Sequence, residues 1–165
     1  TKDLTKASVL ENEALRLVKQ GFLTEKQLDV IDLESIGRFF QGALGKRLLQ
    51  RPKAVRREVP FTLATPVDEV YGQAGMDDDH VIVQGVIDCL VEEREGILLI
   101  DFKTDRVSRQ SVHKVAASYR VQIDQYCRAV EMIFGQKVWQ AYLYFLQKDL
   151  AVPMPDIKGQ PDKTD

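Results

Sequence analysis

Apolar residues are concentrated in two runs near the middle of the chain, at 81–91 and 97–102. Both runs are rich in valine, isoleucine and leucine, and a charged segment that ends in glycine separates them. This pattern predicts a β-hairpin with a short turn. A two-residue turn at 94–95 places Asp88 opposite Asp101 on one face of the hairpin. A three-residue turn places Asp88 on the other face unless a bulge corrects the register.

Before the hairpin, apolar residues recur at helical spacing. The pattern predicts an amphipathic helix over 5–20 that ends at Gly21. A capping box at Thr24 predicts a short second helix through residue 30. Residues 33–49 follow as one or two helices, with glycines marking a possible break.

The remaining segments alternate between strand, loop and helix patterns. Residues 55–63 predict a strand, which Pro60 restricts to an edge or a bulge. The segment 65–80 is rich in proline, glycine and aspartate and predicts a loop. The longest helical pattern covers 111–134, and residues 138–146 predict a final strand.

The order of these elements predicts an α/β fold with a central mixed sheet flanked by helices. We expect a single domain over 1–149, with a helical part over 1–52 and the core over 53–149. Residues 150–165 contain three prolines and few apolar residues, and they predict a flexible tail.

Composition narrows the classes of function. The net charge is −2, so contact with nucleic acid requires a local basic patch. The cluster Arg47–Arg57 is such a patch, and it is either a solvated face or an edge that contacts phosphates. The two cysteines, Cys89 and Cys127, form no CxxC pair, which favours a reduced cytoplasmic setting over a zinc or iron–sulfur site. No apolar run approaches the length of a membrane span, about 20 residues, and no signal peptide precedes the helices.

The hairpin also contains charges that a buried strand does not normally tolerate. Asp101 and Lys103 are two residues apart and share one face of their strand, with Asp88 on the neighbouring strand. Two carboxylates beside one lysine leave an excess of negative charge that a hard divalent ion, Mg²⁺ or Mn²⁺, balances. The alternative is a purely structural arrangement, with a buried Asp–Lys ion pair and the other aspartate bonded to the backbone at a strand end. The acidic run 77–79 before His80 is interpreted as a turn tip rather than a metal site.

Four short motifs, taken together, resemble the PD-(D/E)xK nuclease superfamily in its RecB-like branch. They are Glu58 in REVPF, Gly85–Asp88 in GVID, Asp101–Lys103 in DFK, and Gln122 with Tyr126 in QxxxY. The resemblance covers about residues 21–146. The sequences of three segments, VQGVIDCL, IDFKTDRV and YRVQIDQYCRAV, are most similar to the AddA family of helicase–nucleases.

This resemblance implies a restriction-endonuclease-like core and a Mg²⁺-dependent exonuclease, with Mn²⁺ as a substitute, that acts in double-strand break repair and recombination. It implies metal ligation by Asp88, Asp101 and the backbone carbonyl of Phe102. Lys103 is expected to orient the attacking water or stabilise charge. Glu58 is expected in a supporting or second-metal role, and Gln122 and Tyr126 are expected to align the lysine or touch the DNA backbone.

The same resemblance implies the partners. They are a single DNA strand delivered by duplex unwinding, the rest of a longer AddA-type chain and an AddB-like partner, all in the bacterial cytoplasm. ATP belongs to helicase domains outside this chain, which has no Walker-type glycine loop. The branch also implies a metal-binding histidine on an upstream helix. No histidine precedes His80, so we expect that helix to lie outside this chain and the fragment to be weakly active.

Two other functions remain open at this point. One is a catalytically silent module that binds DNA or a partner protein on the same fold. The other is a stand-alone endonuclease or junction resolvase of the same superfamily.

Overall fold

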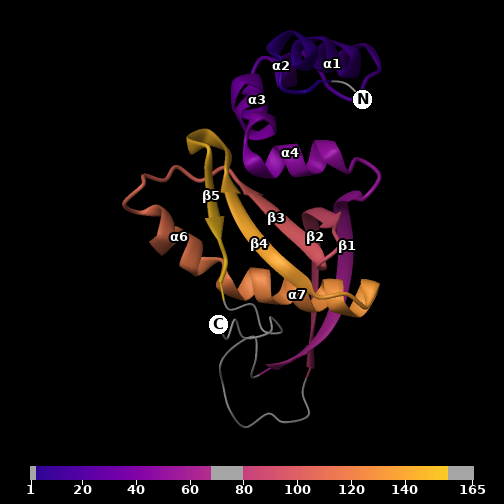
Figure 1. Ribbon diagram of the computed structural model, residues 1–165, viewed down its shortest axis with the longest axis vertical. Coiled ribbons are helices and arrows are strands. Elements are labelled where there is room, and N and C mark those ends of the chain that lie inside the picture. The colour runs from indigo at the N-terminus through magenta and orange to yellow at the C-terminus, as the bar shows by residue number, and fades with distance from the viewer. Residues whose placement is uncertain (1–2, 68–79, 156–165) are drawn as a thin grey trace.

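A mixed sheet forms the centre of the molecule, in a computed structural model that describes residues 3–67 and 80–155. Four helices gather at one end of this sheet, and two more cover one of its faces (Figure 1). The predicted α/β architecture is confirmed.

The four N-terminal helices are α1 (Ala7–Lys19), α2 (Glu25–Leu28), α3 (Leu33–Gln41) and α4 (Ala43–Gln50). The first ends before Gly21, whose φ of 75° favours glycine. Thr24 and Gln27 form the predicted capping box at the start of α2. The predicted break in the third helical pattern falls at Gly42, where the backbone becomes extended between α3 and α4.

The sheet has five strands in the order β1-β2-β3-β4-β5. They are β1 (Val55–Pro66), β2 (His80–Glu92), β3 (Ile97–Lys103), β4 (Val138–Phe145) and β5 (Leu150–Pro153), with a 3-10 turn at Leu146–Lys148. The β3–β4 pair is parallel and the other pairs are antiparallel. As predicted, the strand that contains Pro60 lies at an edge.

The predicted loop over 65–80 is shorter than expected, because β1 runs to Pro66 and β2 begins at His80. The two strands pair along this whole length, from Val55 with Val91 to Pro66 with His80. At residues 65–66 and 80–81, pairing between β1 and β2 outweighs the preference of the local sequence for a turn. The acidic run 77–79 lies outside the described residues.

The prediction of one helix over 111–134 is wrong. The segment forms α6 (Val112–Ser118) and α7 (Arg120–Phe134), which meet at Tyr119. At this junction the Ser118 hydroxyl donates to the Val115 carbonyl at 2.7 Å, a bond that competes with regular helix formation. Gly135 ends α7 in the left-handed region, as predicted.

The prediction of a flexible tail from residue 150 is also wrong for its first residues. Leu150–Pro153 forms β5 and pairs with β4. Val152 and Met154 are buried against the core, so a few apolar side chains suffice to fix this segment. Residues 156–165 lie outside the described part.

The core has two layers of side chains, one on each face of the sheet. On one face Leu90 and Leu99 pack against Ile123 of α7. On the other face Leu98 and Ile100 pack against residues of α3 and α4. Alternate residues of β3 therefore enter opposite layers, as the sequence pattern predicts.

No helix in the described ranges, 3–67 and 80–155, is both long and apolar enough to cross a membrane.

Candidate metal and catalytic site

The turn of the β2–β3 hairpin sets the register of the candidate site. Glu92 pairs with Ile97, and the Glu93 amide donates to the Gly96 carbonyl at 3.0 Å. The turn itself is therefore 94–95, the two-residue turn that places Asp88 opposite Asp101. The register agrees with the one from which the metal-site hypothesis starts, up to its last pair, Cys89 with Ile100.

Asp88 lies where β2 separates from β3. Pairing between these strands ends at Cys89 with Ile100, while β2 continues its pairing with β1. Beyond that point the backbone amide of Phe102 donates to Oδ2 of Asp88 at 2.8 Å. In an extended strand the amide and carbonyl of one residue point toward the same neighbour. The Phe102 carbonyl is therefore directed to the side on which Asp88 lies, as a shared ligand set requires.

Asp101 is a buried carboxylate, 2% exposed. Lys103 Nζ lies 2.6 Å from its Oδ2 and forms a buried ion pair with it. Burial raises the pKa of Asp101, the hydrogen-bonding and charge interactions with Lys103 lower it, and the charge of Asp88 raises it further. The lysine therefore compensates only part of the negative charge at this position.

Lys103 is held by α7 as well as by its own strand. Its Nζ donates to Oε1 of Gln122 at 2.9 Å, and Nε2 of Gln122 donates to the hydroxyl of Tyr126 at 2.7 Å. Burial raises the pKa of Tyr126, and the charge of Asp101 raises it further. Gln122 and Tyr126, selected from the sequence, thus lie beside the lysine as one hydrogen-bonded chain.

Tyr119 and Asp105 also lie near the lysine, and the sequence analysis did not identify them as candidates. Lys103 Nζ lies 4.0 Å from the ring centroid of Tyr119. The Tyr119 hydroxyl donates to the carboxylate of Asp105, with distances of 3.0 and 3.1 Å to its two oxygens. The signal was present, because Tyr119 is one helical turn before Gln122 and Asp105 is two residues after Lys103.

The glycine of the GVID motif supports the site from β2. A Cβ at Gly85 would lie 2.7 Å from the ring of Phe61. Phe61 in turn makes an edge contact with Tyr126, with ring centroids 5.5 Å apart. The absence of a side chain at Gly85 lets Phe61 pack beneath the Gln122–Tyr126 pair.

Glu58 is not drawn into this group. It occupies the register position opposite Asp88, between the pairs Arg57 with Cys89 and Val59 with Ile87. Its φ of 50° departs from strand geometry, and its side chain is exposed. The supporting role expected for Glu58 stays a prediction.

The residues present fit a hard divalent cation. Asp88, Asp101 and the Phe102 carbonyl offer only oxygen donors, and Lys103 is the one cation among the described residues that pairs with the buried carboxylate of Asp101. Within residues 3–67 and 80–155 no group of three or more histidine, cysteine or acidic side chains is placed to hold a metal. An ion held here must therefore retain several waters, as Mg²⁺ usually does. His113 is exposed on α6, outside this donor set.

Comparison with known proteins supports the motif assignment. The sequence profile of the PD-(D/E)XK nuclease superfamily matches residues 3–163. Proteins described as the A subunit of an ATP-dependent helicase/nuclease are similar to this chain in Moorella thermoacetica (44% identical over 133 residues, 79% of this chain and 9% of that protein), Anoxybacillus flavithermus (42% over 156 residues, 93% and 12%) and Listeria welshimeri (39% over 150 residues, 87% and 12%).

The chain thus spans about a tenth of the length of these relatives, between 9% and 12%. The profile match, in contrast, covers nearly the whole sequence and includes every motif discussed above. The chain belongs to the PD-(D/E)XK nuclease superfamily.

Proposed function

We propose that this chain is the metal-dependent DNA nuclease domain of an AddA-type ATP-dependent helicase–nuclease, which hydrolyses DNA exonucleolytically during double-strand break repair. The observation that carries the proposal is the register of the hairpin. Its last pair is Cys89 with Ile100, so the next position brings Asp88 toward Asp101, and Asp101 forms an ion pair with Lys103. This arrangement supports a shared metal site. The structural alternative is an ion pair of Lys103 with Asp101 and a backbone hydrogen bond to Asp88. We favour a metal site because that alternative leaves two neighbouring carboxylates with a single lysine to balance them.

Asp88, Asp101 and the Phe102 carbonyl would hold Mg²⁺, or Mn²⁺ in its place. When bound, such an ion lowers the pKa of a coordinated water and polarises a phosphoryl oxygen. Lys103 supplies a positive charge next to the reacting phosphate, where it orients the attacking water or stabilises developing negative charge. Gln122 fixes the direction of that ammonium through its side-chain oxygen, and Tyr126 fixes the amide.

A basic strip beside the lysine supports DNA as the substrate. We define it as Arg106, Arg109, His113 and Lys114, on the connection to α6 and on α6 itself. All four side chains are exposed, and none makes a hydrogen bond or ion pair with another described residue. Arg106 is three residues beyond Lys103, so their Cα atoms are at most about 11 Å apart. Unpaired cations at this distance suit the backbone of a single strand.

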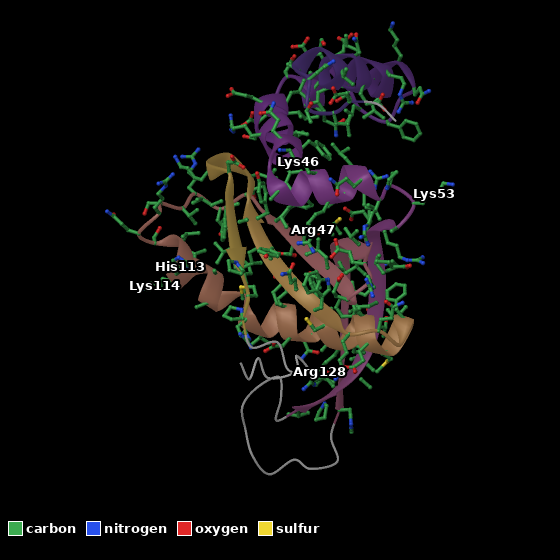
Figure 2. All side chains as sticks on the ribbon, in the orientation of Figure 1. Lys46, Arg47, Lys53, His113, Lys114 and Arg128 are labelled. Carbon is green, nitrogen blue, oxygen red and sulfur yellow. The ribbon has the colours of Figure 1, made fainter. Side chains whose placement is uncertain are left out.

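The other basic cluster, on α4 and the start of β1, is less suited to this role. Arg47 is bound to Glu93, and Arg56 pairs with Glu92. Figure 2 shows Lys53 on the opposite side of the molecule from His113 and Lys114. Of the two alternatives for this cluster, a mainly solvated and structural surface is the one we favour.

The wider assembly follows from the relatives. Their shared description as one component of an ATP-dependent helicase/nuclease supports a longer chain with helicase domains that use ATP, and an AddB-like partner. We place this assembly in the bacterial cytoplasm. A catalytically silent module is disfavoured, because both carboxylates and the lysine are present, and an inactive copy has no physical reason to retain the buried charge of Asp101. A stand-alone endonuclease is disfavoured by the similarity to part of a much longer protein.

Calorimetric titration with Mn²⁺ tests the metal site directly. Wild-type protein and Glu11→Gln, a control at an exposed carboxylate of α1, should bind the ion alike. Asp101→Asn should bind it at least about tenfold more weakly, because the site loses one of its two charged ligands. Equal binding by all three proteins would show that the ion, if bound, sits elsewhere.

Linear and circular single-stranded DNA then separate the modes of cleavage. With Mg²⁺, an exonuclease degrades labelled linear strands and leaves circles intact. Cleavage of circles would favour the endonuclease alternative. Absence of cleavage by this chain and by the helicase–nuclease that contains it would favour the silent module.

A further inference from the structure

The Lys103 ammonium has three partners in a largely buried site, where its side chain is 12% exposed. They are the carboxylate of Asp101 at 2.6 Å, the amide oxygen of Gln122 at 2.9 Å and the ring of Tyr119 at 4.0 Å. Each partner comes from a different point of the fold, namely β3, α7 and the junction between α6 and α7.

Under the proposed function, one of these partners, Asp101, has two interactions to make. Asp101 is both the ion-pair partner of Lys103 and a ligand of the divalent ion. When that ion takes the carboxylate, the ammonium loses much of its strongest partner and faces a like charge. A buried cation without compensation is costly, so the lysine needs other contacts if it is to stay beside the phosphate.

Tyr119 offers such a contact without competing for the metal. The face of an aromatic ring carries negative charge density that attracts an ammonium, but a phenol ring is not a ligand that Mg²⁺ prefers. The ring is also fixed from its far end, because its hydroxyl donates to the carboxylate of Asp105. Asp105 follows Lys103 by two residues, so the lysine and the anchor of its aromatic partner are carried by the same short segment.

The junction between the two helices fits this arrangement. Tyr119 lies between α6 and α7 rather than inside a continuous helix. A simple packing role for the ring would leave its hydroxyl free to face solvent. Instead the hydroxyl is hydrogen-bonded to Asp105, and the ring lies against the ammonium of Lys103.

We propose that Tyr119, anchored by Asp105, is a positioning residue that keeps the Lys103 ammonium in place when a divalent ion occupies Asp101. The inference rests on the proposed function, since it requires metal binding at Asp101. It assigns to Tyr119 and Asp105 a part in metal binding and catalysis without direct contact with the ion.

A double-mutant cycle read out by Mn²⁺ affinity tests the proposal. Tyr119→Leu should weaken Mn²⁺ binding about fivefold, since the displaced ammonium is left with only Gln122. In a Lys103→Met background the same substitution should have no effect, because no ammonium remains to be held. Tyr142→Leu is the matched control, as Tyr142 packs on the opposite face of the sheet.

A nuclear magnetic resonance measurement provides a second test that uses a milder substitution. The ring of Tyr119 shifts the resonances of the Lys103 ε-methylene protons upfield. In wild-type protein this shift should persist on saturation with Mg²⁺. In Tyr119→Phe, which keeps the ring but releases it from Asp105, the shift should diminish when Mg²⁺ is added.

The outcomes are distinct. If wild-type protein binds Mn²⁺ independently of Asp101, the proposed function fails and the inference fails with it. If Asp101 binds the ion but Tyr119→Leu weakens binding equally with and without Lys103, or not at all, the metal site stands and the role of Tyr119 is refuted. Loss of the ring shift in wild-type protein on addition of Mg²⁺ also refutes it.

Discussion

At the scale of single residues, the site is built from groups whose charges are only partly balanced. Asp101 is buried, and Lys103 offsets part of its charge from the same strand. Tyr119, Gln122 and Tyr126 surround the lysine without adding charge. The chemistry therefore depends on one cation in a fixed position.

Replacement of that cation should separate binding from cleavage. Lys103→Met preserves the length of the side chain and should bind Mn²⁺ at least as tightly as wild-type protein, because a competing cation is lost. Cleavage of linear DNA should fall by about 100-fold or more, since charge stabilisation in the transition state is lost. Retained cleavage would exclude the role assigned to Lys103.

Gly85 should be intolerant of the smallest side chain. Gly85→Ala places a Cβ 2.7 Å from Phe61, and we expect the free energy of unfolding to fall by about 1–3 kcal/mol through overpacking. Gly37→Ala in α3 is the control, because a Cβ at Gly37 would lie 3.4 Å from the side chain of Leu10 in α1, which is an ordinary contact distance. Urea unfolding should show no loss of stability for the control, and an unchanged Gly85→Ala protein would contradict the packing argument.

At the scale of elements, a cluster of polar contacts fastens the N-terminal helices to the sheet. Arg47 of α4 donates to Glu93 in the hairpin turn and to Gln140 of β4. The guanidinium also lies over the Trp139 ring, 5.3 Å from its centroid, and Trp139 Nε1 donates to the same glutamate at 3.1 Å. Glu93 thus joins α4, the turn of the hairpin and the start of β4.

This cluster predicts a pH-dependent contribution to stability. The hydrogen bonds from Arg47 lower the pKa of Glu93 below its usual value of about 4.3. A lowered folded-state pKa stabilises the protein above the usual pKa, and the stabilisation is lost as the pH falls through the lowered value. Glu93→Gln should therefore cost about 2 kcal/mol at pH 7, and the cost should shrink as the pH falls below the usual pKa of glutamate.

Urea unfolding at pH 7, 5 and 3.5 checks this expectation. Glu95→Gln is the matched control on the same turn, because Glu95 is exposed, and it should match wild-type protein at each pH. A difference between wild type and Glu93→Gln that is the same at every pH would show that the charge of Glu93 is not responsible.

At the scale of the whole molecule, the charge distribution decides where DNA lies. The net charge is only −2, so no general attraction to nucleic acid exists. The basic strip lies on the connection that follows Lys103 and on α6. In the Arg47–Arg57 cluster, by contrast, two arginines form ion pairs with Glu92 and Glu93 of the β2–β3 hairpin. Among the described residues, the two surfaces therefore differ in that acidic side chains pair with the basic ones only in the Arg47–Arg57 cluster.

A pair of matched triple variants compares these surfaces. Arg106→Gln/Arg109→Gln/Lys114→Gln should bind labelled single-stranded DNA about tenfold more weakly in EDTA, with a slope of log affinity against log salt smaller by about 2. Arg51→Gln/Lys53→Gln/Arg57→Gln removes the same charge and should change binding less than about twofold. Equal loss from both, measured by fluorescence anisotropy, would show that only total charge matters.

Much of the fold follows from local sequence rules. The alternation of β3, the capping box of α2 and the glycine stop of α7 each reflect interactions within a few residues, so the pattern alone predicts them. The sequence left the relation between Asp88 and Asp101 open between two turn lengths, and the hydrogen bond from Glu93 to Gly96 decides for the two-residue turn. The prediction failed at β5, where pairing with β4 fixes the segment. It also failed at the α6–α7 junction, where a side-chain hydrogen bond from Ser118 competes with regular helix formation.

The sequence by itself determined which residues have the chemistry for a metal site, because carboxylates and a lysine within apolar strands are improbable without a purpose. Only the tertiary structure decided how the lysine is held. Tyr119 and Gln122 reach it by packing α7 across the sheet, and such long-range packing has no local pattern. Only the tertiary structure, likewise, left Glu58 exposed.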